Sequence, residues 1–302
     1  MILRFVLTAL LAASLGGCAL KRIAINAVGD SLADSGGVYA SDGDPDLVRE
    51  AIPFGLKTIE GLLAEAPDHR GLLLAAARGF TGYAYLLRQE ADVVEAGDFE
   101  KARGLRARAS KLFLRGRDYG LRGLELDHPG FRDAVMQDKA VALAGTTRDD
   151  AALLYWSGVA WAGALAADPS NLELLAELPI AAGLVKRVLA LDDAFDGGAA
   201  DEFFIAYEAG RPGGDPQAAR KHYQRAVTLS GGRRASVHLA LAESVAVQEQ
   251  DVAEFRRLIA AALAVDPDAA PELRLVNTMA RRRAQWLESH ASDIFLESVP
   301  TE

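Results

Sequence analysis

The sequence predicts an all-α protein folded as a degenerate, irregular array of helical repeats. Alanine and leucine dominate, runs of β-branched residues are rare, and the alternation of polar and apolar residues that marks a strand is nearly absent. From about Pro45 onward, helical patterns are broken by proline, glycine and aspartate. Because 50% of the 302 residues are hydrophobic, the chain has enough apolar material for a substantial core.

The first segment, residues 1–17, is predicted to be a lipoprotein signal peptide. A basic residue precedes an apolar run that is short for a membrane span, and small residues follow. The sequence LGGC at residues 15–18 resembles a bacterial lipobox, whose cysteine is acylated and becomes the new N-terminus. An ordinary signal peptide with an incidental cysteine is the alternative. We expect a mature chain anchored through Cys18 and facing the periplasm, on the outer membrane rather than the inner because Ala19 follows.

Two further segments complete the predicted organisation. Residues 18–44 are rich in glycine, serine and aspartate and are predicted to form a flexible tether with room for one short helix. Residues 45–302 are predicted to form a single helical-repeat domain. Capping signatures predict helix starts at Thr147, Ser170 and Asp251. Helices are predicted to stop near Pro67, Pro129, Pro169, Gly231 and Pro267.

The spacing of these stops favours tetratricopeptide-like repeats. Pro129 and Pro169 are 40 residues apart, and Gly231 and Pro267 are 36 apart, whereas a tetratricopeptide unit has about 34 residues. Two segments carry the small, large and small residues of the second helix of such a unit, namely Ser157, Trp161 and Ala164, and Ala219, Tyr223 and Ala226. The small residues let a partner helix approach, and the large residue fills the gap between units. A non-repeating helical bundle is the alternative.

Three long segments are similar to the TRAP-transporter-associated lipoprotein family called TatT, namely residues 40–87, 152–191 and 219–269. The resemblance implies a periplasmic, lipid-anchored, all-helical protein with degenerate tetratricopeptide-like repeats. It also implies association with the substrate-binding protein of a tripartite ATP-independent periplasmic (TRAP) transporter, in an accessory and non-catalytic role that includes handing over an apolar or organic-acid ligand. A tetratricopeptide-like scaffold for envelope assembly, without a ligand, is the alternative. Association with further copies of the chain stays open.

The charge balance and the motifs exclude several other functions. Lys and Arg number 33 against 42 Asp and Glu, a net charge of −9, and we expect no nucleic-acid partner because phosphate binding requires a basic domain. The single cysteine excludes an internal disulfide and a multi-cysteine metal site. Without a glycine-rich phosphate loop or histidines paired at i and i+4, we expect no cofactor and no metal.

The tether contains the sequence GDSL at residues 29–32, which looks like the nucleophile block of the GDSL esterases. Its Ser31 would need a base histidine, usually in a late Asp-x-x-His sequence. None of the five histidines has an aspartate three residues before it, and the expected strands are missing. An esterase is therefore the third interpretation, and we expect a protein that is not an enzyme and has no catalytic residue.

Aromatic residues make up only 7% of the chain, yet they gather in three segments. In a helical array such clusters usually fill the core. The alternative hypothesis is that they line an apolar ligand cavity. The candidates for this cavity are Tyr83, Tyr85, Trp156, Trp161, Phe204 and Tyr207.

A basic stripe is predicted on one helix face, because cationic residues recur there every seven residues. The stripe consists of Lys101, Arg108, Lys111, Arg115 and Arg122. One interpretation is a solvated face with ion pairs, and the other is a docking surface for an acidic partner or an anionic headgroup. On the other side, Gly116, Gly120 and Gly123 leave a smooth face where another helix is expected to approach closely.

Replacing Cys18 with serine is expected to release the protein from membranes or to stall its processing, because Cys18 is the only anchor that a lipobox offers. Metabolic labelling with a fatty acid, followed by membrane fractionation, measures both effects. Equal labelling of the wild type and of the Cys18→Ser variant would contradict the lipobox.

Overall fold

The computed structural model describes residues 27–32 and 36–296, and every regular element in these ranges is a helix. The all-α prediction is therefore confirmed. Nine helices of twelve residues or more form the framework, namely α3 (Pro45–Glu65), α4 (Arg70–Val94), α5 (Phe99–Glu125), α8 (Ala151–Ala167), α9 (Leu172–Leu191), α10 (Ala199–Gly210), α11 (Pro216–Ser230), α13 (Val252–Ala264) and α14 (Arg274–Ser289). Shorter elements are α2 (Gly36–Ala40), α6 (Phe131–Gln137), α7 (Lys139–Ala144), the 3₁₀ turn η2 (Phe195–Gly197), α12 (Ala235–Leu241), the π-helical segment η3 (Ala242–Ala246) and α15 (Ala291–Ile294).

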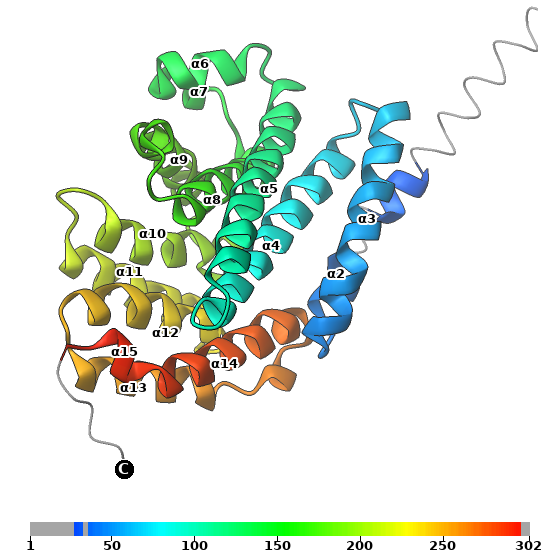
Figure 1. The fold of residues 1–302 in the computed structure, drawn as a ribbon. Coiled ribbons are helices and arrows are strands. Elements are labelled where there is room, and N and C mark those ends of the chain that lie inside the picture. The colour runs from blue at the N-terminus through cyan, green and yellow to red at the C-terminus, as the bar shows by residue number, and fades with distance from the viewer. Residues whose placement is uncertain (1–26, 33–35, 297–302) are drawn as a thin grey trace, which may run out of the picture.

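Consecutive helices pack against one another along the chain, as Figure 1 shows. The chief contacts join α4 to α5, α5 to α8, α8 to α9, and α10 to α11. Short connections make the pairs α4–α5, α8–α9 and α10–α11 antiparallel hairpins. This arrangement agrees with a helical array, while the tetratricopeptide-like register stays a prediction.

The helix ends lie where the sequence predicts them, except at one N-terminal cap. Gly231 ends α11 with φ of 61°, the left-handed conformation that favours glycine. Asp251 caps α13 by accepting a hydrogen bond from the amide of Glu254 at 2.8 Å. The predicted cap at Ser170 is wrong, because Asn171 accepts from the amide of Leu174 at 3.1 Å and is the residue that starts α9.

The glycine face of α5 is a site of close helix approach, as predicted. A Cβ atom on Gly116 would lie 3.1 Å from the carbonyl oxygen of Ala77 on α4. Gly120 faces α8, where a Cβ atom would overlap the hydroxyl of Ser157. Gly123 packs against the same helix. These glycines therefore let α5 lie tightly between α4 and α8.

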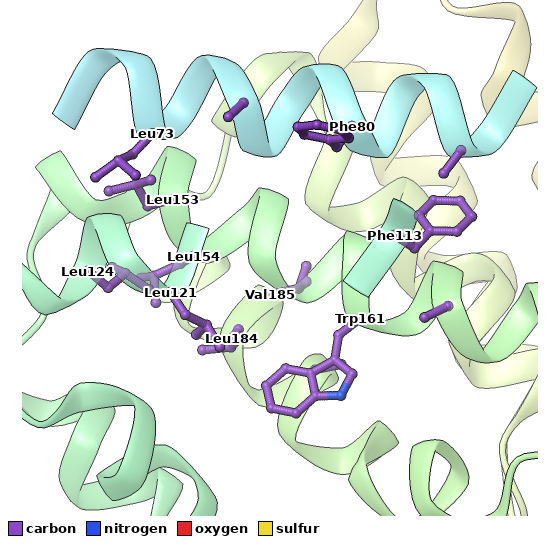
Figure 2. Close-up of a cluster of buried hydrophobic side chains, with 14 of the residues drawn as sticks. Leu73, Phe80, Phe113, Leu121, Leu124, Leu153, Leu154, Trp161, Leu184 and Val185 are labelled. Carbon is purple, nitrogen blue, oxygen red and sulfur yellow. The ribbon is translucent and has the colours of Figure 1, made fainter. Parts of the chain in front are cut away.

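Two apolar clusters fill the interior, and α10 belongs to both. The first runs from α3 to α10 and ends at Phe204, and the second begins at the adjacent Ile205 and continues to α15. Figure 2 shows part of the first cluster, in which Leu73 of α4 lies beside Leu153 of α8, and Phe80 lies further along α4 on the side of Phe113 of α5.

The last long helix, α14, returns to the start of the array, so the succession of helix contacts closes on itself. Arg282 pairs with Asp46 of α3 at 2.9 Å. Arg274 donates to the carbonyl oxygen of Ser41, which follows α2, at 3.2 Å. Polar contacts thereby join α14 to the chain on both sides of the turn that leads from α2 into α3.

The described part of the predicted tether contains two short helices, residues 27–32 and α2, where the expectation left room for one, and its flexibility stays a prediction. Residues 27–32 form one helical turn that lies against α4, because Gly29 has no side chain and approaches His69 and Leu72 closely. Asp30 pairs with the same His69 at 3.3 Å. These contacts hold Gly29 and Asp30 against the start of α4.

Replacing Trp161 with alanine is expected to lower the free energy of unfolding by about 3–5 kcal/mol, the usual cost of deleting a large buried aromatic side chain. Trp161 is 2% exposed, and its indole NH donates to Glu177 at 2.7 Å. Urea unfolding measures the loss, with Phe54→Ala, at an 80% exposed position, as the control that should change it by less than about 0.5 kcal/mol. A loss below about 1 kcal/mol for Trp161→Ala would show that the ring is not a core residue.

Candidate functional site

A pocket of about 420 Å³ lies between α7, α9, α10 and α11. Its apolar wall consists of Pro179, Ala182, Gly183, Leu189, Phe204 and Tyr207. Its polar wall consists of Lys139, Lys186, Glu208, Arg211 and His222. The combination of an apolar wall with a few convergent polar groups is typical of a site for a small organic molecule.

The structure brings two of the six candidate cavity residues into this pocket. Phe204 and Tyr207 meet there edge to face, with ring centroids 5.6 Å apart. Trp161 fills the core between α8 and α9. Tyr83 accepts a hydrogen bond from Arg108, and Tyr85 from Gln89.

The sixth candidate, Trp156, also lies away from the pocket. Its ring meets the ring of Tyr155 edge to face at 5.3 Å, and the guanidinium of Arg78 lies 5.8 Å from its centroid. The six predicted cavity residues therefore do not line one cavity. Two of them line the pocket, Trp161 lies in the core, and the other three contact side chains elsewhere.

The polar wall of the pocket carries excess positive charge. The ammonium of Lys139 donates to the carbonyl oxygen of Pro179 at 2.9 Å and has no carboxylate partner among the described residues. Lys186 is exposed and likewise has no ion pair in the described part of the chain. Arg211 pairs with Glu208 at 2.7 Å. Three cations therefore face one carboxylate, in a chain whose net charge is −9.

His222 lies in the same pocket and is held by a buried carboxylate. Its Nδ1 lies 2.7 Å from Oδ1 of Asp201, a residue that is 1% exposed, and Arg225 donates to the other oxygen of that carboxylate at 3.1 Å. The ring stacks on Phe204 with centroids 5.1 Å apart. Because Asp201 engages Nδ1, Nε2 is the ring nitrogen of His222 that is left for a hydrogen bond inside the pocket.

Comparison with known proteins identifies the family. Residues 41–295 match the sequence model of the TRAP transporter T-component family. The chain is also 30% identical over 303 aligned residues to a protein of Treponema pallidum (strain Nichols), which covers 93% of the chain and 94% of that protein. The chain belongs to the TRAP transporter T-component family. This confirms the resemblance and gives the chain an accessory role in a TRAP transporter, consistent with a cell-envelope location.

The described part of this T-component contains neither a membrane-spanning helix nor a cluster of metal ligands. In residues 27–32 and 36–296, no helix is both long and apolar enough to cross a membrane. Over the same ranges, no group of three or more histidine, cysteine, aspartate or glutamate side chains is placed to hold a metal ion. Cys18 lies outside the described residues.

Four of the five side chains in the basic stripe of this T-component contact the neighbouring helices. Arg115 pairs with Glu60 of α3, and its guanidinium lies 4.8 Å from the ring centroid of Phe80 on α4. The other contacts are Arg108 with the hydroxyl of Tyr83 at 3.3 Å, Arg122 with the carbonyl oxygen of Pro67 at 3.3 Å, and Lys101 with Glu90 at 3.4 Å. Lys111 is exposed. The stripe therefore stabilises the packing of α5, and its role in docking a partner stays a prediction.

The GDSL sequence has no catalytic geometry. Ser31 is exposed on the helical turn at residues 27–32, where an esterase would have a strand followed by the nucleophile. The nearby His69 accepts from the amide of Leu72 through Nδ1 at 3.2 Å and pairs with Asp30 through Nε2. Both ring nitrogens are engaged, so His69 is not available as a base. The family to which the chain belongs is a transporter component and is not a known class of enzymes.

An interior polar group, which the sequence analysis missed, lies where α10 meets the start of α12. Burial raises the pKa of the Glu202 carboxyl, although Nη1 of Arg234 lies 4.0 Å from it. Arg234 is 9% exposed and donates to the carbonyl oxygen of Asp196 at 2.7 Å. Tyr155 of α8 lies close enough for the Glu202 charge to raise the pKa of its hydroxyl further, beyond the effect of burial. The signal in the sequence is a pair of acidic residues inside the apolar run AADEFFIAY.

The Glu202→Gln variant is expected to be more stable than the wild type near neutral pH. A carboxyl whose pKa is higher in the folded than in the unfolded state costs stability once the pH exceeds the unfolded value, here about 4.5. Urea unfolding between pH 4 and pH 8 measures the free energy of unfolding of both proteins. The two values are expected to be similar at pH 4 and to differ increasingly as the pH rises. A pH-independent difference between the two proteins would mean that the carboxyl does not titrate in this way.

Proposed function

We propose that this T-component associates with the periplasmic substrate-binding protein of its TRAP transporter and that its pocket holds an organic acid with an apolar part. Membership of the family supports the association. The observation that carries the ligand proposal is the pairing of unneutralised ammonium groups with an aromatic wall in one pocket of an acidic protein.

The ligand class follows from the groups that face the pocket. Lys139 and Lys186 offer charge-assisted hydrogen bonds to a carboxylate, which are stronger than bonds between neutral groups. Phe204 and Tyr207 offer apolar area to the rest of the molecule. His222, oriented by Asp201, adds a hydrogen bond that discriminates among ligands by their polar substituents.

The protein is further proposed to be lipid-anchored through Cys18 and to face the periplasm, with the outer membrane as its site. The lipobox and the following Ala19 support this proposal. A lipid anchor would hold the T-component at one membrane surface, and the substrate-binding protein would reach it by diffusion.

Association is tested by crosslinking in intact cells followed by purification of the T-component. The expected product contains the substrate-binding protein of the transporter. Recovery of an envelope-assembly complex without that protein would favour the scaffold interpretation and contradict the proposal.

The Lys139→Met, Lys186→Met double variant is expected to bind a medium-chain carboxylate such as octanoate at least roughly tenfold more weakly than the wild type, because each lost charged hydrogen bond is worth about 1.5–3 kcal/mol. Isothermal titration calorimetry measures the affinity. Lys111→Met removes an exposed lysine outside the pocket and is the matched control. Equal affinity of the double variant and the control would remove the pocket from the proposal and leave partner association untouched.

A further inference from the structure

The outer face of α3 is an uncovered apolar edge of the array. Phe54 is 80% exposed and Leu47 is 57% exposed. The two residues are seven positions apart and therefore lie on the same side of the helix. α3 packs against α4 and touches α14, and Figure 1 shows it at the margin of the array. Terminal helices of soluble repeat arrays usually present a polar outer face, so this edge calls for a physical explanation.

The segment that leads into α3 also exposes apolar side chains. Val28 and Val38, in residues 27–32 and in α2, are also exposed. Tyr39 of α2 lies against Gly55 of α3, which places α2 beside the helix that carries Phe54. Four of the eleven exposed large apolar side chains of the described chain thus belong to its first described elements.

We propose that this edge, defined by Val28, Val38, Leu47 and Phe54, rests on the surface of the lipid bilayer to which the chain is anchored. The inference rests on the lipid anchor at Cys18 in the proposed function. Only residues 19–26 separate Cys18 from the first described residue, and that length of chain spans at most about 30 Å. The packing of Gly29 and Asp30 against His69 fixes where the chain joins the body.

The charges around the edge indicate which force holds it. Asp46 pairs with Arg282, and Lys57 pairs with Glu60, so neither offers a free charge to a headgroup. Asp42 and Glu50 leave the neighbourhood acidic, which disfavours attraction to anionic lipids. The contact is therefore apolar, with side chains entering the interface of a zwitterionic membrane, and it is insensitive to salt.

The test depends on the fact that the sequence contains a single cysteine, Cys18. In the lipoprotein the Cys18 thiol is alkylated, so a Phe54→Cys variant has one free thiol for the environment-sensitive fluorophore NBD. Labelled lipoprotein is reconstituted into phosphatidylcholine vesicles with and without a doxyl-labelled lipid as quencher. Leu172→Cys on α9, where leucine is 78% exposed, is the matched control for an exposed apolar side chain elsewhere.

We expect a blue-shifted emission for the label at position 54 and at least twofold stronger doxyl quenching than at position 172, unchanged in 1 M salt. Equal, water-like emission at both positions in fully acylated protein would overturn the membrane contact while leaving the anchor intact. Shielding of position 54 in unlipidated Cys18→Ser protein without vesicles, increasing with protein concentration, would instead assign the edge to a second copy of the chain and equally overturn it. Loss of acylation in the wild type would contradict the anchor itself.

Discussion

Arg283 links the last long helix, α14, to both halves of the helical array. This side chain of α14 is 10% exposed and donates to Glu243 of the π-helical segment at 2.6 Å, while it lies 3.2 Å from Asp92 of α4. One guanidinium thus ties the last long helix to the first half of the array and to the second. Moving a charge from water into the interior costs several kcal/mol. The hydrogen-bonded Glu243 and the nearby Asp92 carboxylate offset part of that cost. Without Arg283 the array would keep the contacts of Arg274 and Arg282 with Ser41 and Asp46, but α14 would lose its ion pairs with α4 and η3.

The same logic explains why polar groups lie between the two apolar clusters. An apolar joint tolerates small shifts of one half against the other, whereas a buried ion pair is satisfied in one geometry only. Glu202 and Arg234 lie beside the boundary at α10, where Phe204 belongs to one cluster and Ile205 to the other. Burial raises the pKa of Glu202, which means that the charged carboxylate is less favourable here than in water.

Features that depend on residues close together in the chain were predictable from the sequence, whereas contacts between distant segments were not. Helix ends depend on a glycine or a capping aspartate close by in the chain, so they were predictable. The glycines of α5 recur on one face, so the close helix approach there was predictable too. The heptad spacing likewise placed Arg108 and Arg115 on one face, but their contacts lie on α3 and α4, at positions that no spacing reveals. The pocket was missed for the same reason, because Lys139, Lys186 and Arg211 come from separate parts of the chain.

The position of the pocket relative to the apolar edge bears on how a T-component would act. α4, α5 and α8 lie between α3 and the helices α9, α10 and α11 that form the pocket, and Figure 1 places the two groups on opposite sides of the molecule. If the edge at α3 meets the bilayer, the helices that form the pocket lie on the side of the molecule away from it, where the proposed substrate-binding protein would have access. A ligand-exchanging surface buried against lipid would exclude that partner. The anchored edge and the open pocket are therefore compatible with one orientation of the protein.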